Sequence, residues 1–160
     1  MRVNHFQSDS NTGTIAVGRE IAKLLTPPKF LILRGDLGAG KTTLVKGIVE
    51  AFDAADRDEV TSPTFTLVHE YEGKWKDDGR ERETPVYHLD LYRIEDERQL
   101  ETLGLDEIAV EDAIVLVEWG EKFPSVMKRS DGEISIEHAG GDARKITLTL
   151  KENQPAHSHS

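Results

Sequence analysis

Hydrophobic positions divide the chain into an alternation of strands and helices. Residues 29–34 form a short apolar run suited to a buried strand, and residues 113–117 form the most continuous apolar run, typical of a strand buried on both faces. Two segments instead carry apolar stripes at helical spacing, made by Val17, Ile21, Leu24 and Leu25 and by Leu44, Val45, Ile48 and Val49. This alternation predicts a three-layer α/β domain with a mainly parallel central sheet.

Further strands are expected near the two ends of the chain. Residues 2–6 predict a short edge strand. Residues 133–138 and 145–150 alternate apolar and polar positions on either side of Gly140-Gly141, which predicts a C-terminal β-hairpin.

The middle of the chain has a more polar pattern. Residues 64–72 and 84–93 predict two strands, and the charged residues 73–83 between them are interpreted as a solvated hairpin tip. Residues 94–104 predict a short surface helix.

One loop, between the first apolar strand and the second helix, carries a recognisable chemistry. Residues 35–43, Gly-Asp-Leu-Gly-Ala-Gly-Lys-Thr-Thr, match G-x-x-x-x-G-K-[ST] at every fixed position. The glycines let backbone amides surround phosphate oxygens, Lys41 reaches the β- and γ-phosphates, and the Thr42 hydroxyl ligates Mg²⁺. The following helix directs its positive end at the anion. We therefore predict a P-loop whose nucleotide contacts come from Asp36, Leu37, Gly38, Ala39, Gly40, Lys41, Thr42 and Thr43.

Hydrolysis would also need a carboxylate beside the P-loop, and the sequence offers two candidates. Glu118 directly follows residues 113–117, so we expect it at the carboxyl end of a central strand, the position of a Walker B acid. Asp90 is the rival, because the alternation in residues 86–93 puts it on one face with His88. That face points either into the nucleotide cleft or into water, and both remain open. His88 and Asp90 also resemble a metal-ligand pair, but an exposed strand explains them better than a zinc site.

Residues 60–66 gather hydroxyl groups around Pro63, between the P-loop helix and the next strand. In P-loop hydrolases this connection carries a switch segment that meets the γ-phosphate and Mg²⁺. Ordinary strand-entry residues account for the same pattern, so both interpretations stay open.

Composition limits the remaining possibilities. The 160 residues fit a single domain over 1–150, followed by a polar tail, 151–160, that we expect to be disordered despite its two histidines. The chain has no cysteine, and hence neither a disulfide framework nor a thiolate metal site. No 18-residue apolar segment occurs, so a soluble cytoplasmic protein without a membrane contact is expected. A net charge of −10 makes the chain alone a poor candidate for gripping nucleic acid.

Four sequence blocks, in this order and spacing, resemble the bacterial TsaE family, the ATPase component of tRNA threonylcarbamoyladenosine synthesis. The likeness covers about residues 5–150. The blocks are G-D-L-G-A-G-K-T-T at 35–43, S-P-T-F-T-L at 62–67, H-L-D-L-Y-R at 88–93 and L-V-E-W-G at 116–120. The resemblance implies a P-loop NTPase fold that binds ATP and Mg²⁺ and has low intrinsic ATPase activity. It also implies that the protein works with TsaB and TsaD, of which TsaD transfers threonylcarbamoyl to adenosine 37 of tRNAs reading ANN codons. The tRNA would be met only indirectly, through that complex.

The resemblance also implies roles for individual residues. By position in the motifs, Lys41, Asp90 and Glu118 would be catalytic, and Thr42 and Glu118 would bind Mg²⁺. Which of the two acids ligates the metal and which orients water stays open. Residues 62–66 would act as a switch, Trp119 would lie near the nucleotide, and Arg144 would reach it from the terminal hairpin.

Three alternative functions compete with this interpretation. A GTPase would need an Asn-Lys-x-Asp element and usually an Asp-x-x-Gly turn, and the sequence has no Asn-Lys pair and no Asp-x-x-Gly. A P-loop small-molecule kinase would need an acceptor pocket and a lid, for which little of the chain is left. A nucleotide-gated binding module, in which hydrolysis is not essential, is the third alternative.

Overall fold

The computed structural model describes the chain except for residues 37–38, 55–67, 78, 110–111 and 152–160. Two predicted nucleotide contacts, Leu37 and Gly38, lie outside the described residues, as do the predicted switch segment and the tail after Lys151.

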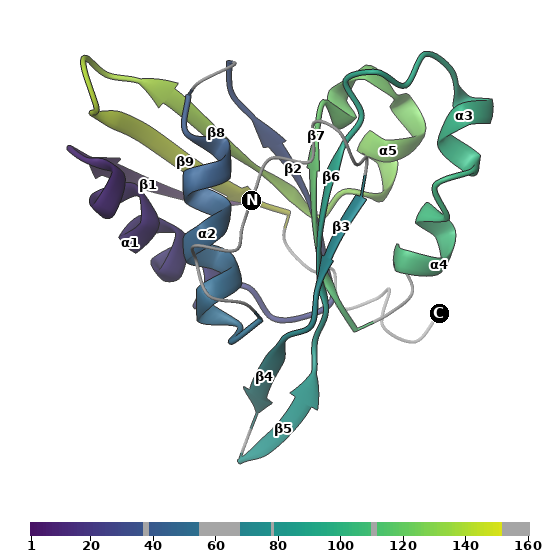
Figure 1. Cartoon of the computed structure of the whole chain (residues 1–160), viewed down its shortest axis with the longest axis horizontal. Helices are drawn as coiled ribbons and strands as arrows, with labels where there is room; N and C mark the ends of the chain where they lie inside the picture. The colour runs from purple at the N-terminus through teal and green to yellow at the C-terminus, as the bar shows by residue number, and fades with distance from the viewer. Residues whose placement is uncertain (37–38, 55–67, 78, 110–111, 152–160) are drawn as a thin grey trace.

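The described strands build a seven-stranded sheet in the order β1-β9-β8-β2-β7-β6-β3 (Figure 1). The inner strands β8, β2, β7 and β6 are parallel, whereas β9, β1 and β3 join antiparallel at the two sides. The mainly parallel central sheet and the C-terminal hairpin, β8–β9, are thus confirmed. The strand bounds are β1 Arg2–Ser8, β2 Lys29–Arg34, β3 Val68–Tyr71, β6 Val86–Asp90, β7 Ile114–Glu118, β8 Gly132–His138 and β9 Arg144–Leu150.

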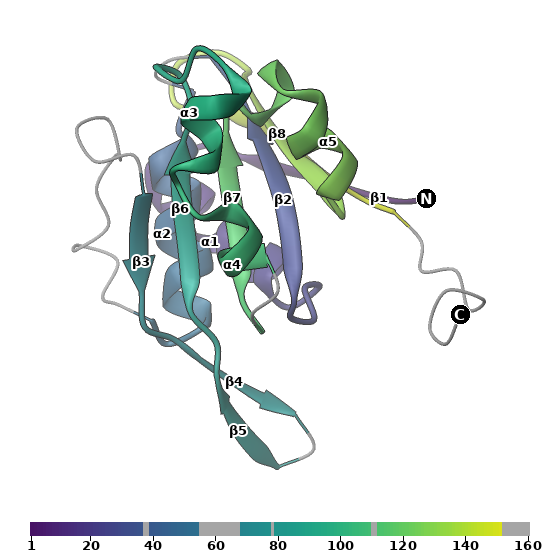
Figure 2. The same cartoon turned by 90° about the vertical axis from the view of Figure 1, so that its right-hand side faces the viewer.

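Helices cover both faces of this sheet, which makes the three predicted layers (Figures 1 and 2). Helices α1 (Asn11–Ala22) and α2 (Lys41–Ala51) bury their apolar stripes against one face, in a cluster with alternate residues of β2, β7, β8 and β9. The short helices on the other face pack on the remaining alternate residues of β2, β6 and β7. They are α3 (Glu97–Glu101), α4 (Leu105–Ala109), the 3₁₀ turn η2 (Gly120–Lys122) and α5 (Pro124–Arg129).

Two predictions for the middle of the chain need correction. The strand expected over 84–93 is β6 and ends at Asp90, and the helix expected over 94–104 is the shorter α3, Glu97–Glu101. Gly104 has φ 73°, a left-handed conformation that a continuous α-helix does not contain, and α4 begins after it, outside the predicted range. None of the described helices is long and apolar enough to cross a membrane.

The charged segment 73–83 does form a hairpin, but one with regular strands. Strands β4 (Lys74–Asp77) and β5 (Arg80–Glu83) pair antiparallel and project beyond the main sheet (Figures 1 and 2). Its base is tied to the P-loop helix, because the Lys74 amide donates to the Phe52 carbonyl at 2.6 Å.

The parallel pairing brings the ends of three strands to one edge of the sheet. In the β2–β7 ladder Leu33 pairs with Glu118, and in the β6–β7 ladder Asp90 pairs with the same glutamate. The P-loop leaves β2 at this edge and enters α2. Ligands of open α/β sheets bind at such carboxyl ends.

Candidate active site

Two glycines shape the P-loop where the structure describes it. A Cβ on Gly35 would lie 2.7 Å from Ile136 Cγ2 and 2.9 Å from the Ile136 carbonyl oxygen, so only glycine lets the loop pack this closely on β8. Gly40 has φ 103° and serves as the N-cap residue of α2, in a conformation that residues with a Cβ rarely adopt. Between them the Ala39 amide donates to the Asp36 carbonyl at 2.9 Å and closes a turn.

Lys41, the first residue of α2, places its ammonium group at the centre of the site. The side chain is only 8% exposed, and Nζ donates to the Gly35 carbonyl at 2.7 Å. The same Nζ lies 3.2 Å from Glu118 Oε1 and 5.2 Å from the centroid of the Trp119 ring. The predicted lysine, acid and tryptophan are therefore brought together by the fold.

Glu118 is the last residue of β7 and is 5% exposed. Its Oε2 accepts a hydrogen bond from His88 Nε2 at 2.6 Å, while Oε1 faces Lys41. Burial by itself would raise the pKa of Glu118, but the hydrogen bond from His88 and the positive charge of Lys41 outweigh it and hold the pKa below its ordinary value. The carboxylate is therefore ionised although it is buried.

The polar face of β6, which carries His88, points towards the P-loop. The sequence had left open whether this face points towards the P-loop or into water. His88 is 0% exposed, so the exposed-strand interpretation of this residue was wrong. The physical reason is the parallel β6–β7 pairing, which turns His88 towards Glu118. Nothing in the alternation of residues 86–90 shows which face of the strand is covered.

Asp90 lies at the end of the same face and is half-buried. Its Oδ1 accepts a hydrogen bond from the Tyr92 amide at 2.9 Å. Burial raises the pKa of Asp90, and the charge of Glu118 adds to this increase; together they outweigh the hydrogen bond from Tyr92 and the nearby positive charges. The two candidate acids thus have pKa values shifted in opposite directions, the arrangement expected of acids with different roles.

Trp119 follows Glu118 with φ 65°, a left-handed conformation that is rare for a bulky side chain. Its ring lies 5.1 Å from that of Tyr92, which is 61% exposed. Lys122 holds the loop after β6 in place, because its Nζ donates to the carbonyls of Tyr92 at 2.7 Å and Ile94 at 2.9 Å. No motif or periodicity in the sequence pointed to Lys122.

The side chain of Arg144, on β9, contacts the backbone of the P-loop. The buried guanidinium donates from Nε to the Ala39 carbonyl at 2.7 Å, and from Nη1 to the carbonyls of Gly141 and Ala143, each at 2.8 Å. The terminal hairpin is thereby tied to the loop that precedes Lys41.

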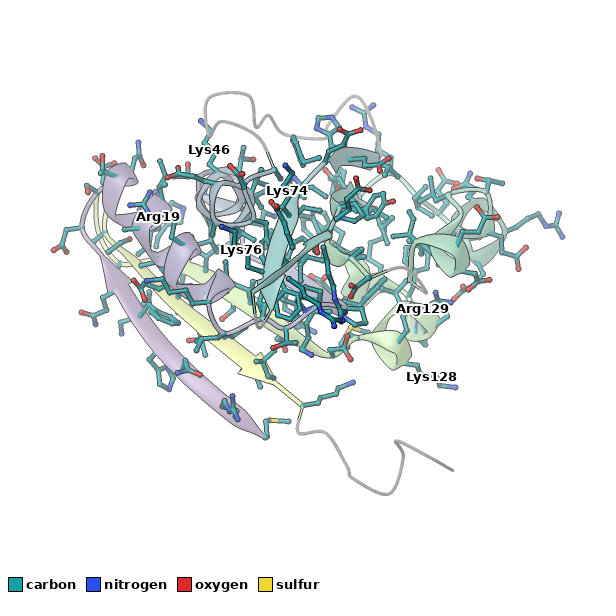
Figure 3. The ribbon with its side chains drawn as sticks, turned by 90° about the horizontal axis from the view of Figure 1, so that it is seen from below. Arg19, Lys46, Lys74, Lys76, Lys128 and Arg129 are labelled. Atoms are coloured by element: carbon teal, nitrogen blue, oxygen red, sulfur yellow. The ribbon has the colours of Figure 1, made fainter. Side chains whose placement is uncertain are left out.

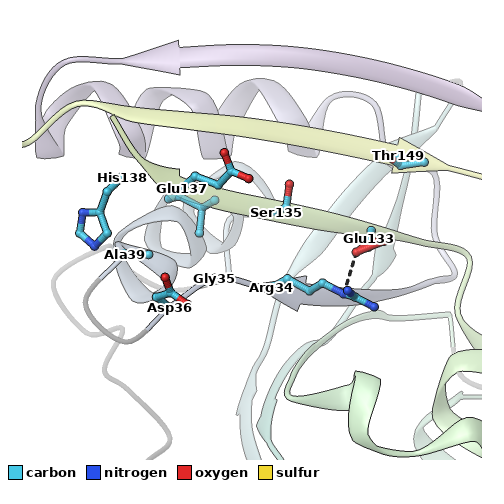
Figure 4. A pocket seen from close by; sticks show the side chains of 10 residues that line it. Arg34, Gly35, Asp36, Ala39, Glu133, Ser135, Glu137, His138 and Thr149 are labelled. Atoms are coloured by element: carbon cyan, nitrogen blue, oxygen red, sulfur yellow. Dashed lines mark ion pairs between the residues drawn. The ribbon is translucent and has the colours of Figure 1, made fainter. Parts of the chain in front are cut away.

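A hollow of about 640 Å³ lies on another side of the P-loop, between its first residues and β8 (Figure 4). An ion pair between Arg34 and Glu133, 2.9 Å apart, spans β2 and β8 there. Asp36, Glu133 and Glu137 make this lining acidic, so it would repel phosphate. The Lys41 side of the loop is the better place for a polyphosphate.

The oxygen atoms on the Lys41 side of the P-loop suit Mg²⁺ as ligands. Thr42 provides a hydroxyl on the first turn of α2, and Glu118 provides an ionised carboxylate next to Lys41. Among the described residues, no group of three or more His, Cys, Asp and Glu forms a complete metal cage. One or two protein oxygens completed by phosphate oxygens is the usual way in which proteins hold Mg²⁺ with a nucleotide.

Comparison with known proteins shows the family of the chain. The family model described as "Threonylcarbamoyl adenosine biosynthesis protein TsaE" matches residues 8–146. The chain belongs to the TsaE family. The TsaE of Bacillus subtilis is 40% identical over 141 residues, which cover 88% of this chain and 82% of that protein. The TsaE of Haemophilus influenzae is 37% identical over 134 residues, or 83% of this chain and 78% of the relative.

A solved structure supports the fold as well. The crystal structure of Bacillus subtilis YdiB superimposes with a TM-score of 0.66 at 31% sequence identity, covering 95% of this chain and 88% of that one. The resemblance read from the four sequence blocks, and the P-loop NTPase fold it implied, are therefore confirmed.

Proposed function

We propose that this TsaE-family protein binds ATP with Mg²⁺ and hydrolyses it in the cytoplasm, in the service of threonylcarbamoyl modification of adenosine 37 in tRNAs reading ANN codons. TsaB and TsaD are its proposed partners. One observation carries the ATPase part of the proposal: a buried, ionised Glu118 lies 3.2 Å from the P-loop lysine, at the strand edge where the loop begins.

Each residue has a proposed task in this reaction. Backbone amides of residues 36–43 and the ammonium of Lys41 bind the phosphates, and Thr42 and Glu118 hold Mg²⁺. The metal, when bound, neutralises charge on the β- and γ-phosphates. Trp119 lies beside Lys41 and so borders the phosphate site.

The opposite pKa shifts support a division of labour between the two acids. Glu118, with its lowered pKa, is the better metal ligand because ligation needs the ionised form. Asp90, with its raised pKa, is the better proton acceptor. We propose that Asp90 takes the proton of a water molecule as this water attacks the γ-phosphorus in line, so that ADP leaves and phosphate is released.

The distribution of positive charge supports an indirect contact with tRNA. The six cations labelled in Figure 3 lie in two places: Arg19, Lys46, Lys74 and Lys76 over α1, α2 and β4, and Lys128 and Arg129 on α5. Three of these six form ion pairs: Arg19 with Glu50, Lys74 with Glu81, and Arg129 with Asp106. With a net charge of −10, such a surface would need partners to hold an RNA.

The ATPase proposal is tested with purified protein by calorimetry and phosphate release. Lys41→Ala should weaken ATP binding, whereas Asp90→Ala and Glu118→Ala should reduce turnover more than binding. Lys46→Ala is the matched control, because it removes a lysine from the same helix away from the site. Binding of ATP that does not depend on Mg²⁺, or wild-type turnover by Glu118→Ala, would contradict the proposed roles.

The partner proposal needs a second experiment. Phosphate release should rise when TsaB, TsaD and a substrate tRNA are added together, and the three proteins should co-elute. Unchanged turnover and separate elution would leave ATP binding intact but would refute the assigned pathway role.

A further inference from the structure

His88 is a buried histidine whose ring has one hydrogen-bond partner among the described residues and no exposed surface. Nε2 lies 2.6 Å from Glu118 Oε2, and the exposed fraction of the residue is 0%. The other ring nitrogen, Nδ1, has no hydrogen-bond partner in the part of the chain that the structure describes. The contact with Glu118 is therefore the polar interaction that accounts for a histidine at this place.

The two oxygens of Glu118 are divided between two donors. Oε2 faces His88 on β6, whereas Oε1 faces Lys41, which itself donates to the Gly35 carbonyl at the start of the P-loop. Strand pairing produces this arrangement, because β6 and β7 are parallel neighbours and place His88 beside Leu116, two residues before Glu118. The oxygen directed at the P-loop is thus the one that His88 does not hold.

We propose that His88 is a positioning residue: its Nε2–H holds Oε2 of Glu118, so that Oε1 is presented towards the P-loop lysine and the magnesium–nucleotide complex binds there. This inference rests on the proposed function, since it concerns the carboxylate assigned to Mg²⁺.

The physical reason is the freedom of a glutamate side chain. Without a second donor, the carboxylate can rotate about its last torsion and offer either oxygen, and fixing it then costs binding free energy. Hydrogen bonds to metal-ligating carboxylates orient the ligand, and losing such a partner typically lowers metal affinity about 10–100-fold. A buried carboxylate also needs donors to offset its lost hydration, which the Nε2–H supplies.

The geometry also specifies the tautomer of the ring. An ionised carboxylate only accepts hydrogen bonds, so Nε2 carries the proton that is shared with Glu118. Nδ1 has no hydrogen-bond partner among the described residues, so the contact of Nε2 with Glu118 is the one that specifies a ring proton there. Long-range ¹H–¹⁵N correlation spectra of the wild-type protein, without nucleotide, should show His88 with its proton on Nε2. A proton on Nδ1 alone would overturn the proposal.

Two variants separate positioning from simple packing. His88→Leu keeps an apolar side chain of similar bulk and removes the donor, whereas His88→Gln retains an amide N–H at about the reach of Nε2. ADP affinity is measured by calorimetry for each, with Mg²⁺ and with a chelator. For His88→Leu we expect ADP affinity in the presence of Mg²⁺ to fall about 10–100-fold, and ADP affinity with the chelator to stay at the wild-type value. His88→Gln should recover most of the affinity lost in the presence of Mg²⁺.

Each result has a distinct meaning. Equal loss of affinity in both conditions, or no recovery in His88→Gln, would assign His88 a packing role and overturn the inference; so would an unchanged magnesium effect in His88→Leu. If His88→Leu does not fold, the glutamine variant and the wild-type spectrum still decide. Absence of any magnesium-dependent binding by the wild-type protein would instead refute the proposed function itself.

Discussion

Helices α1 and α2 cross at two glycines, and a methyl group at this crossing tests how the P-loop helix is held. A Cβ on Gly47 of α2 would lie 2.0 Å from the Ile15 carbonyl oxygen of α1, and one on Gly18 would lie 2.3 Å from the Leu44 carbonyl oxygen. Both distances are more than an ångström shorter than the 3.4 Å at which ordinary contact begins. Because the obstacles are backbone atoms, Gly47→Ala forces the helices apart.

The expected size of the effect follows from two opposing contributions. Overpacking a close contact costs about 1–3 kcal/mol or more, and a backbone obstacle puts this crossing at the upper end. Replacing glycine by alanine within a helix returns about 1 kcal/mol. We therefore expect Gly47→Ala to lower the free energy of unfolding by about 2 kcal/mol. For a domain of this size that corresponds to a fall in Tm of roughly 4–8 °C.

Thermal and denaturant unfolding, followed by circular dichroism, measure this change. Gly13→Ala in α1 is the control, because its Cβ would meet side-chain atoms of Ser10 and Ser8 at 3.3 Å and the backbone Cα of Ser8 no closer than 3.8 Å, and we expect a much smaller shift. Nucleotide affinity should also fall in Gly47→Ala, since α2 begins at Lys41. A variant that melts at or above the wild-type temperature would refute the close-crossing argument.

Three further predictions concern the site. Arg144→Lys removes the hydrogen bond from Nε to the Ala39 carbonyl, a charged hydrogen bond worth about 1.5–3 kcal/mol, so calorimetry should show ATP affinity reduced about tenfold or more. Lys145→Ala, at the exposed neighbouring position, is the control. Equal ATP affinities of Arg144→Lys and the wild type would contradict the proposed role of Arg144. Trp75→Phe leaves Trp119 as the only tryptophan of the chain. The fluorescence of Trp119 should change when ATP binds to Lys41, because Nζ of this lysine lies 5.2 Å from the ring centroid. Binding that is detected by calorimetry without a change in emission would disprove this coupling. The pKa of Glu118 lies below its ordinary 4.5 in the folded protein, so this group stabilises the fold above pH 4.5 and the contribution is lost as pH falls through the folded value. Denaturant unfolding as the pH falls below 4.5 should therefore depend more steeply on pH for the wild type than for Glu118→Gln, and equal slopes would refute the shift.

Predictions from sequence were most accurate where a pattern was strong and local. The apolar run 29–34 coincides with β2, and the run 113–117 differs from β7 by one residue at each end. The helix expected over 94–104 exists as α3 but is shorter, Glu97–Glu101, and the sequence did not predict the separate helix α4 after Gly104. The hairpin at 73–83 was expected, but its charged sequence did not predict that the two arms form regular strands.

The sequence by itself determined the P-loop motif, because its glycines, Lys41 and Thr42 stand within nine consecutive residues. It also named both candidate acids, Glu118 because it follows an apolar run and Asp90 because the alternation puts it on one face with His88. Only the tertiary structure decided how they are paired. His88 meets Glu118 across 30 positions and Arg144 meets Ala39 across 105, because parallel strands and a returning hairpin converge on one sheet edge. An alternating pattern states which side chains share a face; what covers that face depends on the neighbouring strands and helices.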